Sequence, residues 1–147
     1  MAERAARWDA EPTEVSAPRL RIGLIAPPWV AVPPPEYGGT ELVIDQLARG
    51  LTAAGHEVVL CTTGDSTCPV ERHWTLPAAV GTTGSLHHEL AHVQAAYVAL
   101  EHCDVIHDHT LMGPLWAIAR RIEQPVVTTA HGEFTVELTD LYRTVGD

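Results

Sequence analysis

Three observations predict a doubly wound, Rossmann-like α/β fold with a parallel sheet. Short apolar segments alternate with stretches of helical periodicity, in the order strand, helix, strand, strand, helix, strand, helix, strand. The strand segments are continuous apolar runs, as expected where helices cover both faces of a sheet. Polar or glycine motifs follow three of these segments, and in such sheets ligands bind at the carboxyl ends of the strands.

Residues 1–19 mix glutamate, arginine, alanine and proline without periodicity, which predicts a disordered leader. The apolar run at 20–26 predicts a buried first strand, which two prolines close before a proline-rich loop. Apolar residues at helical spacing predict a helix over 40–54, and Gly55 ends it. The segment 57–62 predicts a second strand.

The second half of the chain continues the alternation. The stretch 85–102 contains strong helix formers and neither glycine nor proline, and the helix expected after it opens with a proline in its first turn. We predict strands at 73–76, 104–107 and 125–130, and helices at 85–102, at 114–122 and from about 135 onwards.

Composition narrows the functional classes. The chain has 147 residues, 46% of them hydrophobic, a size suited to one domain. Its formal net charge is −10, with nine arginines and no lysine, which argues against nucleic acid and anionic membranes as partners. No run of about 18 apolar residues and no signal-peptide pattern occur, so we expect neither a transmembrane segment nor secretion.

The three cysteines lack CxxC spacing, which argues against a disulfide framework and a thiolate zinc site. Free thiols fit a reducing compartment, so the sequence predicts a cytoplasmic protein. Cys68 stands beside a proline in a predicted loop and is the candidate for an exposed thiol.

The first polar feature is Gly38-Gly39-Thr40-Glu41, at the start of the predicted first helix. Two glycines there let backbone amides approach an anion closely, and the helix dipole favours negative charge. The pair could equally serve only the turn out of the proline-rich loop. The pattern is neither GxGxxG nor a P-loop, so dinucleotide and ATP fingerprints are absent.

Two histidine motifs follow later strands. In His107-Asp108-His109, alternate side chains of an extended segment share a face, so the two imidazoles could bind a metal or line a crevice. We favour the crevice, because two ligands do not make a metal site. His131 and Gly132 follow the strand predicted at 125–130, where an imidazole could reach a ligand or make a structural hydrogen bond.

A competing motif lies on the predicted helix at 85–102. His88, Glu89 and His92 match the pattern HExxH, which places two imidazoles on one helical face beside a candidate general base, as in zinc peptidases. The continuation lacks the glycine and third histidine of the extended motif, and the α/β fold does not suit that class. A zinc peptidase is therefore a minor alternative.

Several of these motifs belong to one ordered set that runs from residue 20 to about residue 143. They are Ile25-Ala26-Pro27-Pro28-Trp29, Val32-Pro33-Pro34, Tyr37-Gly38-Gly39-Thr40-Glu41, Gly55-His56-Glu57-Val58, Gly64-Asp65-Ser66, Asp104-Val105-Ile106-His107-Asp108-His109 and Thr129-Ala130-His131-Gly132. The set resembles the amino-terminal, acceptor-side domain of family 4 retaining glycosyltransferases of the GT-B fold.

The resemblance implies an enzyme with two Rossmann-like domains that face each other across a cleft. It implies that His131 reaches the transferred sugar as the catalytic residue, that transfer retains the anomeric configuration and that no metal cofactor is needed. The residues that it assigns to the donor diphosphate and the substrate are Gly38, Gly39, Thr40, Glu41, His109 and Gly132.

The family's second domain, with its paired-glutamate motif and its basic grip on the nucleotide, is missing from the sequence given. We therefore expect residues 20–147 to be a truncated domain that binds donor weakly and transfers nothing alone. The implied partners are a nucleotide sugar, an acceptor small molecule or glycan, and the missing carboxy-terminal domain. The loop at 27–37 is the expected determinant of acceptor choice. A stand-alone module that binds a small ligand or a protein is the remaining alternative.

Overall fold

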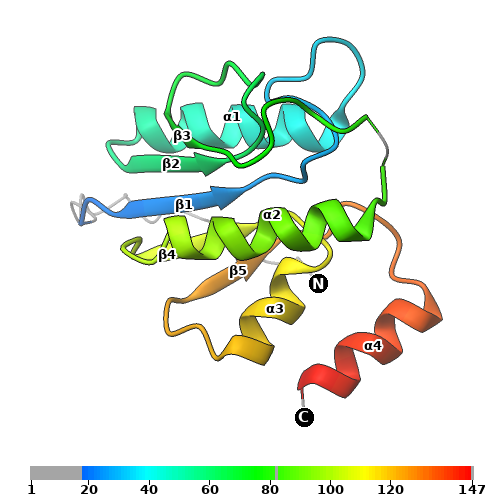
Figure 1. Cartoon of the computed structure of the whole chain (residues 1–147). Coiled ribbons are helices and arrows are strands. Elements are labelled where there is room, and N and C mark those ends of the chain that lie inside the picture. Colours follow the sequence, from blue (N-terminus) through cyan, green and yellow to red (C-terminus); the bar gives the residue numbers. More distant parts are fainter. Residues whose placement is uncertain (1–17, 82, 147) are drawn as a thin grey trace, which may run out of the picture.

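The computed structural model describes residues 18–81 and 83–146 (Figure 1). Most of the predicted leader at 1–19 lies outside the described residues. The elements are β1 (Arg21–Ile25), α1 (Gly39–Ala53), β2 (Glu57–Cys61), β3 (Glu71–His73), α2 (Leu86–Ala99), β4 (Val105–Asp108), α3 (Gly113–Arg120), β5 (Val126–Thr128) and α4 (Val136–Gly146).

The five strands form one parallel sheet in the order β3-β2-β1-β4-β5. The chain first moves outward from β1 to β2 and β3, and then returns to add β4 and β5 on the other side of β1. Helices cover both faces, with α1 on one side and α2 and α3 on the other (Figure 1). The predicted Rossmann-like, doubly wound class is therefore confirmed.

The two faces of the sheet explain the continuous apolar runs. Ile22 and Leu24 of β1 pack in the core beneath α1, whereas Ile25 packs in the core beneath α2. Because successive residues of a strand point to opposite faces, a strand covered on both sides needs apolar residues at every position. Gly23 allows a close approach, since a Cβ there would lie 2.8 Å from the Leu100 side chain.

Two boundaries differ clearly from the prediction. The strand expected at 73–76 was misplaced: β3 ends at His73, whose carbonyl accepts the amide of Thr62. This edge strand is half-exposed and polar, so apolar periodicity gives no signal for it. The helix expected at 85–102 ends at Ala99, because the chain turns at Leu100 to enter β4.

The expectation for Cys68 was wrong. Its side chain is 1% exposed and packs in the core beneath α1, while its amide donates to the carbonyl of Val32. All three cysteines are free and buried. Burial raises the pKa of the Cys61 and Cys68 thiols to about 12, which keeps both in the unreactive protonated form.

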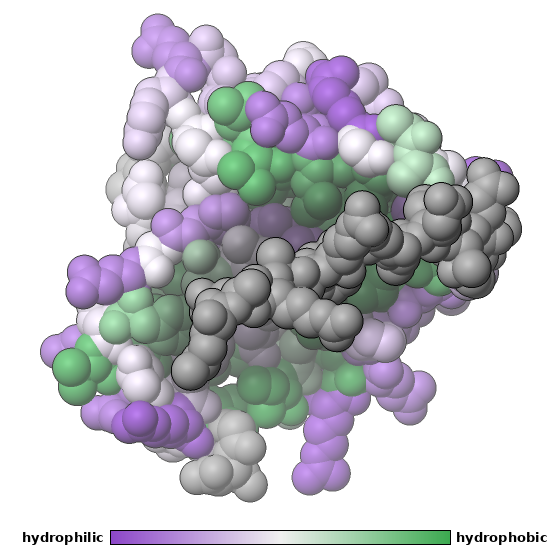
Figure 2. All heavy atoms as spheres, turned by 180° about the vertical axis from the view of Figure 1, so that it is seen from behind, coloured by the Kyte–Doolittle hydropathy of each residue, from purple (hydrophilic) through white to green (hydrophobic). Residues whose placement is uncertain are grey.

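In the part of the chain that is described, every helix is too short or too polar to cross a bilayer. Seen from behind, hydrophilic and hydrophobic side chains mix across the molecule (Figure 2). The exposed large apolar side chains near the carboxyl terminus belong to Val127 of β5 and to Phe134, Val136 and Leu141 at α4.

The end of β4 is fixed by a fully buried carboxylate. Asp108 accepts hydrogen bonds from the Tyr97 hydroxyl at 2.7 Å, the Thr110 amide at 2.8 Å and the Thr110 hydroxyl at 2.7 Å. The Thr110 hydroxyl in turn accepts the amide of Gly113, where α3 begins. A Cβ at Gly113 would overlap the Asp108 carboxylate, so this position requires glycine.

We expect Gly113→Ala to lower the free energy of unfolding by about 1–3 kcal/mol, because the added methyl overpacks the Asp108 network. Gly50→Ala is the matched control, since a Cβ at this exposed position of α1 meets nothing within 4 Å. That change should raise stability by up to about 1 kcal/mol, as for glycine in other helices. Urea unfolding measures both, and equal effects of the two substitutions would contradict the packing argument.

Candidate functional site

A cleft of about 590 Å³ lies at the carboxyl ends of β1, β4 and β5. The loops that follow these strands line it, together with the start of α1 and the loop before α2. It brings together all of the predicted site residues, which are Gly38, Gly39, Thr40, Glu41, His109, His131 and Gly132. A second hollow of about 180 Å³, between Trp74 and α2, contains none of them.

The two glycines at the start of α1 have different surroundings. A Cβ at Gly38 would lie 2.6 Å from Cβ of Pro34 and 2.9 Å from Oε2 of Glu41, so packing requires glycine there. A Cβ at Gly39 would meet no atom within 4 Å. The packing of the chain therefore does not require glycine at 39, and this residue lines the cleft.

The amino end of α1 carries partial positive charge. No side chain forms a hydrogen bond that caps the helix at Gly38, so no capping group offsets the charge of the first-turn amides. Glu41 is buried in this first turn and lines the cleft. Burial raises the pKa of the Glu41 carboxyl, and a hydrogen bond from its own amide partly offsets that rise.

The imidazoles of His107, His109 and His131 form a row, which we call the histidine row, and its members His109 and His131 line the cleft. The rings of His107 and His109 stack with centroids 4.2 Å apart, and those of His109 and His131 stack at 5.1 Å. Nδ1 of His109 lies 2.8 Å from Nε2 of His131, and Nε2 of His107 lies 2.8 Å from the Thr129 hydroxyl. The predicted pairing of His107 and His109 on one face is confirmed.

The histidine row is neutral near pH 7. Burial lowers the pKa of all three imidazoles, and for His109 burial together with its neighbours His107 and His131 lowers it to about 3. The row therefore offers hydrogen-bonding nitrogens instead of positive charge. Within residues 18–81 and 83–146, no group of three or more histidine, cysteine or carboxylate side chains is placed to hold a metal ion.

The HExxH residues have structural partners. Glu89 is fully buried and accepts the amides of Leu111 at 2.6 Å and Met112 at 3.3 Å, which fixes the loop before α3. His92 is also buried, and its Nε2 lies 3.0 Å from the carbonyl oxygen of Ala26. These contacts use Glu89 and His92 to build the fold, so the structure gives the zinc-peptidase alternative no support.

Sequence reasoning did not assign individual roles to other lining residues. Trp29 and Tyr37 come from the proline-rich loop, which was expected to govern acceptor choice, and Thr83 and Gly84 come from the loop before α2. The Trp29 indole nitrogen is buried and has no hydrogen-bond partner among the described residues. The position of Trp29, in a loop at the carboxyl end of the first strand, was the sequence signal that could have identified it as a residue of the cleft.

A parallel α/β sheet with a cleft at the carboxyl ends of its strands defines a Rossmann-like domain, the fold in which ligands bind at that edge of the sheet. Residues 37–145 match the family model described as Glycosyltransferase Family 4, and this match covers more than half of the chain. The chain therefore belongs to Glycosyltransferase Family 4. A search of curated proteins finds no match.

Acid should destabilise the domain through the histidine row. An unfolded histidine has a pKa of about 6.5, so below this pH the unfolded chain binds protons that folded His109 does not take up until about pH 3. The contribution of neutral His109 to the free energy of unfolding is thus complete above about pH 6.5, and it is lost as the pH falls towards the pKa of the folded protein. We expect His109→Gln to weaken the loss of stability between about pH 7 and about pH 5, measured by urea unfolding.

The matched control is His102→Gln, which removes an exposed imidazole outside the row. Burial raises the pKa of Asp108 and Glu89, which acts in the opposite direction, but both carboxyls remain in each variant. An unchanged pH dependence in His109→Gln would show that this imidazole does not set the acid sensitivity.

Proposed function

We propose that this chain is the acceptor-side part of a glycosyltransferase that moves a sugar from a nucleotide-sugar donor to an acceptor with retention of configuration. The observation that carries the proposal is the uncapped start of α1, where Gly39 lines the same cleft as His131 and where a Cβ would meet no atom within 4 Å. Family membership supports glycosyl transfer in general. The donor class, the stereochemistry and the residue roles are the proposal.

The donor diphosphate would bind the amides at Gly38, Gly39 and Thr40. Amides at a helix start donate hydrogen bonds to anions, and the helix dipole adds favourable charge. Negative charge grows on the leaving diphosphate during transfer, so the same amides would stabilise the transition state. This arrangement needs no metal cofactor to neutralise that charge.

The transferred sugar would lie against His131 and Gly132. A Cβ at Gly132 would meet no atom within 4 Å, so the backbone there leaves room for a ligand. The neutral His131 imidazole, held by His109, is suited to hydrogen-bond a sugar hydroxyl, while Glu41 and Thr40 complete the lining. The acceptor oxygen bonds to the anomeric carbon, the bond from that carbon to the diphosphate breaks, and the hydroxyl proton passes to the departing diphosphate.

The nucleotide needs groups beyond this cleft. None of the described lining residues is a lysine or an arginine, so we place the basic contacts to the nucleotide on a second domain that faces the cleft. Closure of two domains would exclude water and align donor with acceptor, and this chain alone would bind donor without transfer. A cytoplasmic location is part of the proposal, because free cysteines are typical of reducing compartments.

Substitutions at the two glycines test the diphosphate site. We expect Gly39→Ala to keep the thermal stability of the chain, because its methyl meets no atom of the protein, and to weaken binding of nucleotide sugars by about tenfold, because the methyl crowds a diphosphate bound at these amides. Gly39→Val should weaken binding further. Ligand-observed NMR with a panel of UDP-sugars and GDP-sugars measures the affinity, and thermal unfolding reports the fold.

Gly38→Ala and Gly50→Ala are the controls. The first should lower thermal stability because its methyl meets Pro34 and Glu41, whereas the second lies in α1 away from the cleft and should leave donor affinity unchanged. Donor affinity that stays the same in Gly39→Ala and Gly39→Val would remove the diphosphate from the start of α1.

A further inference from the structure

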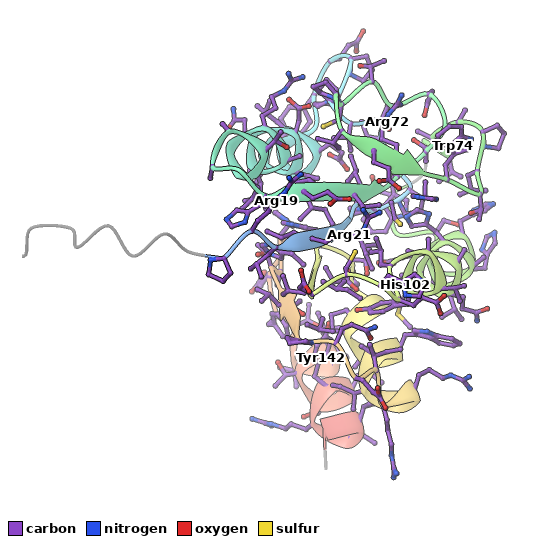
Figure 3. All side chains as sticks on the ribbon, turned by 90° about the vertical axis from the view of Figure 1, so that its left-hand side faces the viewer. Arg19, Arg21, Arg72, Trp74, His102 and Tyr142 are labelled. Carbon is purple, nitrogen blue, oxygen red and sulfur yellow. The ribbon has the colours of Figure 1, made fainter. Side chains whose placement is uncertain are left out.

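The positive charges of the described chain lie outside the cleft. Among the described residues that line the cleft, Glu41 is the one carboxylate, and no lysine or arginine occurs. Figure 3 views the molecule from the amino ends of the strands, where Arg21 forms an ion pair with Glu57. Arg72 lies over the ring of Trp74 at 5.9 Å. These arginines have partners elsewhere and do not serve the cleft.

The histidine row does not replace the missing charge. Burial lowers the pKa of each of its imidazoles, so the row is uncharged near pH 7. The chain as a whole carries a formal charge of −10, which repels anions over a longer range. Apart from the start of α1, none of the described residues that line the cleft thus offers positive charge to a negative ligand.

The rest of the cleft suits a ligand with many hydroxyls. Trp29 lines it with an indole, and Tyr37 stands at the same loop with 93% of its surface exposed. Flat aromatic rings pack well against the C–H faces of sugar rings. Nε1 of Trp29 and Nε2 of His109 are both buried without a partner in the described part of the chain. A hydroxyl both donates and accepts, so a polyol can serve either nitrogen.

We propose that the acceptor is an uncharged sugar ring or polyol, packed on Trp29 and hydrogen-bonded by His109, and that phosphorylated acceptors are excluded. The inference rests on the proposed function, which assigns the start of α1 to the donor diphosphate. A second anion in the part of the cleft that this chain lines would meet Glu41 and the diphosphate, and none of the described lining residues is a cation that offsets either charge.

The test compares neutral ligands with their phosphorylated counterparts on the full chain. Ligand-observed NMR titrations use methyl α-glucoside, methyl α-mannoside and myo-inositol against glucose 6-phosphate, mannose 6-phosphate and myo-inositol 1-phosphate. We expect at least one neutral ligand to bind, and its phosphorylated counterpart to bind about tenfold more weakly or worse. Maltose distinguishes a free ring from the end of a glycan, and tighter binding of either one supports the proposal.

Three variants locate the effect. Trp29→Ala should weaken binding of the neutral ligand by about tenfold, whereas Trp74→Ala removes a half-exposed indole outside the cleft and should not. Val30→Arg adds a cation to the lining and should strengthen binding of the phosphorylated ligand by about tenfold. This gain cannot result from misfolding, so it keeps the test informative if Trp29→Ala is unstable.

The proposal is overturned if phosphorylated ligands bind the unmodified chain as tightly as neutral ones, or if no neutral ligand binds. Insensitivity of binding to both Trp29→Ala and Val30→Arg would also overturn it. The proposed function has a separate readout: donor binding that depends on Gly39 can persist when this inference fails, and its loss sinks the diphosphate site whatever the acceptor results.

Discussion

The site depends on one buried carboxylate. Asp108 is fully enclosed, and an ionised carboxylate away from water is costly unless hydrogen bonds replace its hydration. Tyr97 supplies one bond from α2, and Thr110 supplies two from the loop that enters α3. Three elements therefore meet at this side chain, and the adjoining His109 inherits its position from them. Loss of one of these hydrogen bonds would leave a buried polar atom without a partner beside the wall of the cleft.

A second buried carboxylate, that of Glu89, stabilises the loop between β4 and α3. Glu89 accepts the amides of Leu111 and Met112, which directly follow the segment that Asp108 holds. Burial raises the pKa of both carboxyls, and the nearby Asp108 raises that of Glu89 further, while burial lowers the pKa of His109. The interior at this edge thus disfavours charge of either sign. A cleft built on such a base presents neutral polar groups, although the protein as a whole is strongly acidic.

The sequence was sufficient where a local pattern has a direct physical cause. The apolar runs of β1 and β2 exist because helices cover both faces of the sheet, and carboxyl ends of parallel strands gather by geometry, so motifs far apart were expected at one edge. The sequence did not reveal which side chains form contacts between distant segments. The bond between His109 and His131 depends on the β4–β5 register, and the partners of Glu89 and the burial of Cys68 depend on packing across segments.

Charge also separates the two ligands that a transferase must hold. In the proposed function the first turn of α1 binds the diphosphate, yet Glu41 lies in that turn and accepts a hydrogen bond from its own amide. A diphosphate bound there would compete with this carboxylate for the amide, and burial, which raises the pKa of Glu41, already disfavours the charged form of the carboxyl. A neutral acceptor meets no such competition. In the proposed arrangement, one acidic side chain at a helix start therefore lies at the donor position and not at the acceptor position of the cleft.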